Sequence, residues 1–450
     1  MVVVGARCAG APVAAMLARR GLRVVVVEQA RFPRNTLSSH VMQADSIGFL
    51  DRLGVIESIR ATGAPFLSGV DARVEDLRFV ADYPLRVDDL GGGACIRRHV
   101  LDPILAEAAA GAGADVRMAT KVTGLVEEGG RVAGVRVTHG RSAMELRADL
   151  VIGADGRNST VAKLCGARDY NVTQSQRAYY WTYFDSADLS AEPRFVFHRW
   201  GDRFVIAAPA DNGMYMVGVS PEATEREQFR RDLEGSFMDH VLSCEPVATL
   251  LGEPHRAAKI FGIVRFSGYF REAAGPGWVL VGDSGHFKDP AAGRGIGDAF
   301  RQVEMLAPAV TAGLGGSGGM GPALARWGRW RDDEFAEHYW AGADFGRAGP
   351  VGQIFSAAIE RLSAEGDTGR FLELLSHRVR PSELLTPGSL LRVTGGLLRR
   401  PGQRRAVLGE LRTLVGQQVR RHWVNRHPVF APAAPTVADA GSAEHEMVGV

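Results

Sequence analysis

The first 28 residues constrain the fold more than any other part of the chain. Residues 2–4 form a short apolar run, residues 5–10 form a turn that begins and ends with glycine, and residues 11–20 have the apolar pattern of a helix. A second apolar run over residues 22–27 ends at Glu28. A strand, a glycine-rich turn, a helix, a strand and an acid in this order indicate a βαβ unit that binds a dinucleotide.

Each position of this turn has a physical role. Gly5 allows the tight turn out of the strand, and Gly10 lets the helix pack close to the sheet. The helix N-terminus presents free N–H groups and a positive dipole to a pyrophosphate, and Glu28 can accept hydrogen bonds from an adenosine ribose. Arg7 replaces the middle glycine of G-x-G-x-x-G, so its side chain either turns aside or adds a cation near the pyrophosphate. The cofactor-binding candidates here are Gly5, Ala6, Arg7, Gly10 and Glu28, and the alternative is a degenerate unit that binds nothing.

Two more glycine clusters follow strand-like apolar runs. The first is Gly-Ala-Asp-Gly at 153–156, which leads into a helix. The second begins with Gly-Asp at 282–283 and continues through Asp-Pro at 289–290 to the glycine-rich stretch 293–297, where another helix is expected to start. No second βαβ unit of the dinucleotide type is present, so any NAD(P)H would bind transiently at the site formed by these clusters.

Together the three clusters resemble the FAD-dependent monooxygenase family that contains the aromatic hydroxylases, to which flavin halogenases and geranylgeranyl reductases are related. The resemblance covers roughly residues 1–330. In that family the second cluster reads G-A-D-G-x-x-S-x-V-R, whereas Ala162 stands here at the arginine position and Lys163 follows it. The implied fold is α/β, with a Rossmann-like FAD-binding domain, an inserted antiparallel-sheet substrate domain and a helical C-terminal region.

The resemblance also implies contacts between individual residues and FAD. Asp283 would hydrogen-bond the ribityl chain or a ribose, and Pro290 with the glycines that follow it would lie against the isoalloxazine. Arg98, in an R-x-x-L-D stretch, would contact the phosphate or ribose region, and the backbone of Val122 would reach the adenine. These further cofactor-binding candidates are Arg34, Arg98, Val122, Asp155, Gly156, Asp283, Pro290, Gly293, Gly295 and Ile296.

The implied activity is that of an FAD-dependent monooxygenase. It would use NAD(P)H and O2 to hydroxylate or epoxidise a small apolar or aromatic substrate through a flavin C4a-hydroperoxide, in specialised metabolism. A helix that starts at residues 293–295 would direct N–H groups at the flavin and stabilise negative charge on reduction. The alternatives are a flavin-dependent reductase of isoprenoid double bonds, a flavin-dependent halogenase, and a non-catalytic FAD-fold binding protein.

Residues 171–274 lose the alternation of strand and helix. Short apolar stretches separated by turns predict a mostly antiparallel sheet, to which residues 73–90 add two strands. The predicted organisation is then an FAD-binding domain, a sheet domain, a helical region and a disordered tail. Their residues are 1–72, 91–170 and 275–312 for the first, 73–90 and 171–274 for the second, 322–427 for the third, and 428–450 for the tail.

One strand of this sheet is strongly aromatic. A period of two places Tyr179, Trp181 and Tyr183 on one face and Tyr180 and Phe184 on the other. One face should line a pocket for an apolar or aromatic substrate, unless all five residues belong to the sheet core. The substrate candidates are His40, Tyr180, Trp181 and Tyr183, and for His40 the alternative is a hydrogen-bonded loop histidine.

Composition narrows the classes of function. The 450 residues are 46% hydrophobic and 23% charged, which is typical of a globular protein, and no apolar run approaches the length of a membrane-spanning helix. A net charge of +2 gives no general attraction to nucleic acid. The four cysteines stand far apart without a C-x-x-C pair, and no signal peptide is recognisable, so we expect a cytoplasmic protein. The first strand looks clipped, as if a few residues precede it.

The C-terminal region is rich in arginine. Residues 390–427 contain nine arginines and one glutamate. This pattern is typical of a solvated helix face, and the alternative is a surface for a membrane or an acidic partner. The sequence assigns no catalytic side chain, no metal ligand and no oligomeric state.

Overall fold

One half of the molecule is built on a mostly parallel sheet. The computed structural model describes residues 1–431 apart from residues 37, 39, 88 and 317. The six strands have the order β19-β20-β11-β1-β2-β7, and every neighbouring pair is parallel except β19 and β20. The strands are β1 (Val2–Val4), β2 (Val25–Val27), β7 (Asp115–Arg117), β11 (Val151–Gly153), β19 (Ala274–Gly275) and β20 (Trp278–Leu280).

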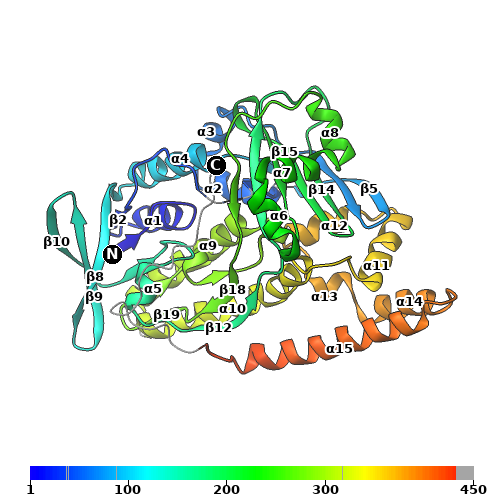
Figure 1. Cartoon of the computed structure of the whole chain (residues 1–450). Coiled ribbons are helices and arrows are strands. Elements are labelled where there is room, and N and C mark those ends of the chain that lie inside the picture. Colours follow the sequence, from blue (N-terminus) through cyan, green and yellow to red (C-terminus); the bar gives the residue numbers. More distant parts are fainter. Residues whose placement is uncertain (37, 39, 88, 317, 432–450) are drawn as a thin grey trace.

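Both faces of this sheet are covered, which explains its valine-rich strands. Val3 and Val26 point to one face, where they pack against α1 (Gly10–Ala18), α4 (Arg98–Gly111) and α9 (Gly295–Gly315). Val2 and Val4 point to the other face, where the antiparallel sheet of β8 (Thr120–Glu128), β9 (Arg131–His139) and β10 (Ser142–Arg147) covers them. Figure 1 shows this small sheet at the outer edge of the molecule, beyond β2.

The other half contains a seven-stranded sheet of order β17-β13-β16-β15-β14-β4-β5. All its neighbouring strands are antiparallel except β14 and β4. Two strands come from early in the chain and lie beside strands from its middle, as their colours in Figure 1 show. The strands are β4 (Gly69–Val74), β5 (Leu77–Asp82), β13 (Tyr179–Phe184), β14 (Arg194–Trp200), β15 (Arg203–Pro209), β16 (Tyr215–Val219) and β17 (Phe261–Ile263).

The two faces of this sheet pack against different elements. Tyr179, Trp181 and Tyr183 share one apolar cluster, whereas Tyr180 and Phe184 belong to another, as the alternation predicts. The second cluster is closed by α6 (Arg226–Arg231), α7 (Leu233–Leu242) and α8 (Glu245–Leu251). The first cluster faces the rest of the molecule and the C-terminal helices.

Smaller elements connect the two halves. A three-stranded sheet has the order β12-β18-β21, and β3 pairs with β6. Their bounds are β12 (Asp169–Gln174), β18 (Ser267–Arg271), β21 (His286–Phe287), β3 (Val41–Met42) and β6 (Ala94–Cys95), and the short helices nearby are α2 (Ala44–Arg52), α3 (Ile56–Arg60) and α5 (Thr160–Leu164). The arrangement confirms the predicted α/β fold with an inserted, mostly antiparallel sheet.

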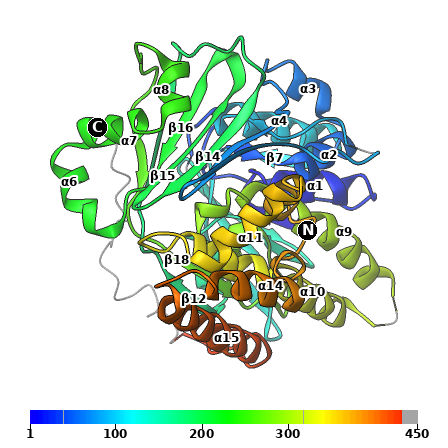
Figure 2. The same ribbon diagram turned by 90° about the vertical axis from the view of Figure 1, so that its right-hand side faces the viewer.

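The C-terminal region is helical, as predicted. Its helices are α10 (Met320–Phe345), α11 (Gln353–Ala364), α12 (Gly369–Leu375), α13 (Pro381–Leu384), α14 (Pro387–Leu398) and α15 (Arg404–Arg426). Helix α15 runs along the outer edge of this region in both views (Figures 1 and 2). Phe430 forms a β-bridge with Tyr170, and residues 432–450 of the predicted tail lie outside the described residues. Within the described residues, no helix has both the length and the apolar character needed to cross a membrane.

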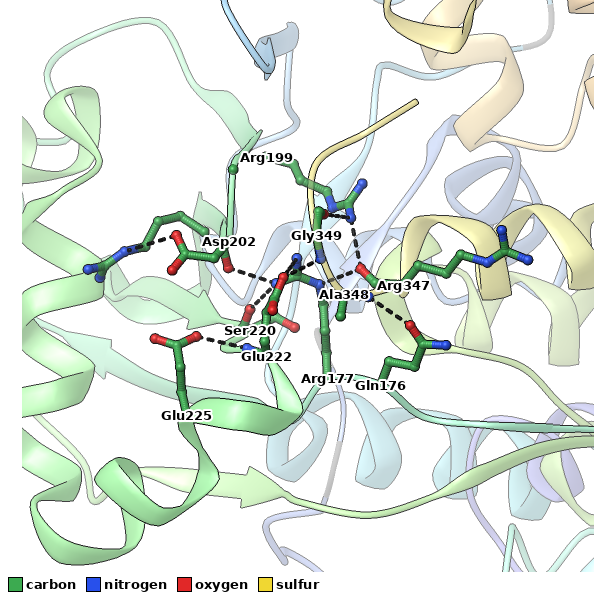
Figure 3. Close-up of polar contacts among 12 residues, drawn as sticks. Gln176, Arg177, Arg199, Asp202, Ser220, Glu222, Glu225, Arg347, Ala348 and Gly349 are labelled. Carbon is green, nitrogen blue, oxygen red and sulfur yellow. Dashed lines mark hydrogen bonds and ion pairs between the residues drawn. The ribbon is translucent and has the colours of Figure 1, made fainter. Parts of the chain in front are cut away.

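Two buried arginines join the helical region to the seven-stranded sheet (Figure 3). Arg177 donates to the backbone carbonyl of Arg347 at 2.9 Å, and Arg199 donates to the carbonyls of Arg347 and Gly349 at 2.8 and 3.0 Å. Glu222 accepts from the Gly349 amide and forms an ion pair with Arg177 at 3.3 Å. The segment between α10 and α11 is therefore held by side chains of the sheet half.

Candidate functional site

A cavity of about 540 Å³ lies between the parallel-sheet half and the seven-stranded sheet. Residues of both halves line it. The structure brings most of the predicted site residues together there, and only Ala6, Gly10, His40 and Tyr183 are not among the lining residues. The predicted residues that line the cavity are Gly5, Arg7, Glu28, Arg34, Arg98, Val122, Asp155, Gly156, Tyr180, Trp181, Asp283, Pro290, Gly293, Gly295 and Ile296.

The glycine turn after β1 leaves no room for side chains. Gly5 has φ +99°, and a Cβ there would lie 2.5 Å from the carbonyl oxygen of Ala154. A Cβ on Gly10 would lie 1.8 Å from the carbonyl oxygen of Gly5. Ala9 precedes α1 and has no polar side chain to cap it. In the first turn the amides of Ala11 and Val13 donate to the carbonyls of Arg7 and Ala9 at 3.0 and 3.2 Å, and Pro12 has no N–H, so it is the Gly10 amide that is available to a ligand.

Backbone groups hold the acid at the end of β2. The Glu28 carboxylate accepts from the amides of Ala6 and Ala30 at 3.0 and 2.9 Å and is 4% exposed. Arg7 turns toward the following loop, where it donates to the Thr36 hydroxyl, and its Nε remains 3.9 Å from Glu28. Its guanidinium therefore lies to the side of the turn and still lines the cavity.

A buried ion pair stands next to this turn. Arg98 Nε donates to Asp102 at 2.8 Å, and Arg98 Nη2 donates to the second carboxylate oxygen at 3.1 Å. The Cys8 thiol lies 3.6 Å from the same carboxylate, and burial raises the pKa of this thiol to about 12. The ion pair orients Arg98 toward the cavity, while Cys8 stays a neutral thiol.

The third glycine cluster also lines the cavity and begins beside the first turn, since a Cβ on Gly282 would lie 2.8 Å from the Cβ of Ala9. Asp283 lies in the short 3-10 helix η3 (Gly282–Ser284), and burial raises the pKa of its carboxyl to about 6. This carboxyl receives no hydrogen bond from any residue in the described part of the chain. Gly293 has φ +62°, and α9 begins two residues later at Gly295. A carboxyl and a helix N-terminus thus face the same space.

Several charged residues that line the cavity were not predicted from the sequence. Lys288 and Asp289 belong to the third cluster, and both are at most 6% exposed. Asp289 accepts from the Tyr179 hydroxyl at 2.6 Å, and burial raises the pKa of its carboxyl to about 6. Two charged residues just before Pro290, within an otherwise apolar and glycine-rich stretch, were a signal available in the sequence. Nothing in the sequence pointed to Tyr179 as the partner of Asp289.

Comparison with known proteins now identifies the family. Residues 1–321 match the family described as FAD binding domain. The chain belongs to this FAD-binding family. It is similar to 6-methylpretetramide 4-monooxygenase of Streptomyces rimosus, with 27% identity over 318 residues that cover 69% of this chain and 75% of the relative. It is also similar to digeranylgeranylglycerophospholipid reductase of Methanosarcina mazei, with 26% identity over 324 residues that cover 69% and 74%.

Solved structures show the same fold. The flavin-dependent brominase Bmp2 superposes with a TM-score of 0.70 at 17% identity, covering 88% of this chain and 97% of the brominase. A probable FAD-dependent monooxygenase from Pseudomonas aeruginosa superposes with a TM-score of 0.62 at 20% identity, covering 83% and 98%. Family and relatives together make this flavoprotein an FAD-dependent oxidoreductase.

Two substrate candidates of the flavoprotein lie behind the cavity wall. His40 Nε2 and the Tyr183 hydroxyl are 2.8 Å apart, and both side chains are buried. Burial lowers the pKa of His40 to about 3, so its ring is neutral. His40 is therefore a hydrogen-bonded loop histidine, as the alternative prediction has it. Tyr180 and Trp181, in contrast, line the cavity itself.

Proposed function

We propose that the chain is an FAD-dependent monooxygenase that uses NAD(P)H and O2 to hydroxylate or epoxidise a small apolar or aromatic molecule. The observation that carries this proposal is the cavity, which joins the glycine turns of the parallel-sheet half to an apolar wall on the seven-stranded sheet. The named activity of the Streptomyces rimosus relative supports it.

The residues present fit FAD. The turn at Gly5 and Gly10 excludes even a Cβ, so the backbone of the turn and the Gly10 amide at the start of α1 can approach a pyrophosphate. Glu28 is oriented to accept from ribose hydroxyls, and Arg98 adds a positive charge nearby. Asp283 has acceptor capacity that the described residues leave unused, which suits the hydroxyls of a ribityl chain. Arg34, Val122 and the residues of the third cluster would complete the contacts.

Bound FAD would supply two-electron transfer from NAD(P)H and the activation of O2. The protein has three tasks around it. The N-terminus of α9 presents N–H groups, which stabilise negative charge at the end of the cavity. Asp283 and Pro290 line the same cavity. The seven-stranded sheet excludes water and positions the substrate.

The substrate wall is apolar. Trp181, Phe204, Ile206, Met216 and Ile263 line the cavity from four strands of the seven-stranded sheet. They offer dispersion contacts and few hydrogen bonds, which selects for an aromatic or largely apolar molecule. Tyr179, next to them, has its hydroxyl occupied by Asp289.

A reductase of isoprenoid double bonds is the second candidate, because several relatives at 25–27% identity are named digeranylgeranylglycerophospholipid reductases. Such an enzyme would also need an apolar wall. The halogenase alternative is supported only by structures that share the fold. The non-catalytic alternative would give no function to the buried charged residues that line the cavity. The cytoplasmic location stays a prediction from the cysteine pattern.

The test starts with the purified protein and its flavin spectrum. We expect a yellow protein that oxidises NAD(P)H with O2 consumption and releases H2O2 when no substrate is present. Screening candidate aromatic and apolar compounds for faster NAD(P)H oxidation would then find substrates, and mass spectrometry should show one added oxygen atom. Turnover without O2, or dependence on halide and a separate flavin reductase, would contradict the monooxygenase proposal. A protein that retains no flavin would support the non-catalytic alternative.

A further inference from the structure

Lys288 is unusual among the lysines of this chain. The four lysines are Lys121, Lys163, Lys259 and Lys288, and only Lys288 is buried, at 5% exposure. It lines the cavity two residues before Pro290. Its Nζ lies 2.6 Å from Asp298 Oδ2 and 3.0 Å from His377 Nε2. An ammonium group is strongly hydrated in water, so its burial here requires these partners.

His377 completes this cluster from a distant part of the chain. It follows α12, outside the residues that match the FAD-binding family. Its φ of +56° lies in the left-handed region, which is uncommon for a residue with a side chain and concentrates at functional sites. Its Nδ1 is 3.2 Å from Asp298 Oδ1, so the ring contacts both members of the ion pair. The rings of His377 and His338 stack at 3.5 Å.

Opposing effects act on the pKa of Lys288. Burial lowers the pKa of Lys288 to about 8, Asp298 opposes this shift, and Arg294 adds to it. Burial also lowers the pKa of His377 well below its ordinary value, so the ring is neutral and accepts from Lys288 through Nε2. Titratable and charged groups face the cluster from several elements and from the residues beside them. They are Asp45 of α2, Asp298 of α9, His338 of α10, His286 of β21, Asp283 of η3, Arg294 just before α9, and His377 and Arg380 after α12.

Stability alone does not account for the buried ion pair of Lys288 with Asp298 and its contact with His377. Replacement of a buried ion pair by apolar residues is often neutral or stabilising, so this pair is not explained by stability alone. Lys288 stands beside Asp289 and Pro290 at the end of the cavity where α9 begins. Negative charge that enters this end would raise the proton affinity of the amine nearby.

We propose that Lys288 exchanges a proton with solvent in step with the redox state of the bound flavin, and that Asp298 and His377 are its positioning residues. The proposal rests on the placement of the flavin given above. When two electrons from a reductant enter the cavity, the neutral Lys288 amine takes up one proton from water and becomes an ammonium ion. When the electrons leave, it returns that proton. The exchange is largest between the Lys288 midpoints of the two forms, where the oxidised form holds the neutral amine and the reduced form holds the ammonium ion.

The first measurement uses holoenzyme labelled with [ε-13C]lysine. Four lysine resonances are expected, and the one absent from Lys288→Arg belongs to Lys288. In the oxidised protein it should titrate near pH 8, below the ordinary value for a lysine. Reduction with dithionite should raise this midpoint by about one unit or more. Asp298→Asn should lower it in both redox states, because the opposing carboxylate is lost.

The second measurement is the flavin midpoint potential between pH 6 and 10. Between the Lys288 midpoint of the oxidised form, near pH 8, and that of the reduced form, the wild-type potential should fall more steeply with pH, by one extra proton for each two electrons. Lys288→Arg keeps a cation beside Asp298 but cannot release a proton, so it should lose the extra slope; Lys288→Met should lose it too. Lys163→Met, at an exposed lysine, should behave as wild type.

Three results would overturn the proposal. The Lys288 midpoint could be the same in both redox states, Lys288 could titrate with the exposed lysines, or Lys288→Arg could keep the wild-type slope. A protein without flavin absorbance would overturn the proposed function and this inference together. A protein that keeps flavin but oxygenates no compound would contradict only the proposed function, because neither measurement needs a substrate.

Discussion

The glycine turn at residues 5–10 and the junction of the C-terminal helices with the seven-stranded sheet are built in opposite ways. The turn is made by backbone groups within the first 30 residues, and Glu28 is held by the amides of Ala6 and Ala30. The junction is made by buried side chains, and Arg177 reaches a carbonyl 170 residues away. A site made from backbone groups can be recognised in the sequence as a short pattern of neighbouring residues. A junction made from side chains shows in the sequence only as isolated charged residues.

Removing Arg177 should have the largest effect on stability. Its guanidinium donates to the carbonyls of Arg347, Asp202 and Ser220 at 2.8–2.9 Å. Arg177→Met would leave the Glu222 carboxylate without its cation and remove one donor from each of these carbonyls, although Arg199 still donates to that of Arg347. We expect this to cost about 3–5 kcal/mol. Urea unfolding followed by circular dichroism should show this loss. Arg420→Met, at an exposed arginine of α15, should change little. A loss under about 1 kcal/mol for Arg177→Met would show that the junction does not depend on this arginine.

Filling the glycine turn should be the next largest change. Gly10→Ala places a Cβ 1.8 Å from the carbonyl oxygen of Gly5, so the helix must shift away from the sheet. We expect about 1–3 kcal/mol of lost stability and protein that purifies without flavin. Gly111→Ala, at the end of α4 where a Cβ meets no atom within 4 Å, is the matched control and should keep its flavin. Normal flavin content in Gly10→Ala would refute the close approach.

Asp283 tests the contribution of a side chain that lines the same cavity. Asp283→Ala removes a carboxylate that faces the proposed ribityl chain, and hydrogen bonds to a charged group contribute about 1.5–3 kcal/mol. FAD affinity, measured by flavin fluorescence during titration, should fall about 10- to 100-fold. Asp333→Ala removes an exposed carboxylate from α10 and should keep wild-type affinity. Wild-type FAD occupancy in Asp283→Ala would refute the assignment of this residue.

The smallest expected effect is a pH dependence of the flavin-free protein. Burial raises the pKa of Asp283 to about 6, above the ordinary value of 3.8, so the folded state binds this proton more tightly than the unfolded state. The ionised carboxyl therefore destabilises the fold above pH 6, and the penalty disappears as the pH falls toward 4. Asp283→Asn has no such penalty. Its Tm should exceed the wild-type Tm at pH 7.5, and the gap should shrink at pH 5. A gap that is independent of pH would contradict this account.

The sequence predicted the features that depend on near neighbours. The turn at Gly5, the acid at Glu28 and the start of α9 near Gly295 were all expected. The alternation that separates Trp181 from Tyr180 was expected too, because the period of an extended strand is a local property. These elements determined the α/β fold class and the family.

Contacts between distant segments were not predictable in this way. The pairing of His40 with Tyr183 spans 143 residues, and that of Lys288 with His377 spans 89. Each residue alone reads as an ordinary loop or helix residue. Their partners were decided only when the seven-stranded sheet and the C-terminal helices packed around the cavity.

The sequence by itself therefore determined the glycine turns, the strands and the FAD-binding family, because backbone conformation and strand periodicity are set over a few residues. The tertiary structure alone decided which charges are buried together, because burial and proton affinity depend on what the whole fold packs against them. Lys288 shows the difference most clearly. Its position beside Pro290 was visible in the sequence, but its partners Asp298 and His377 were not.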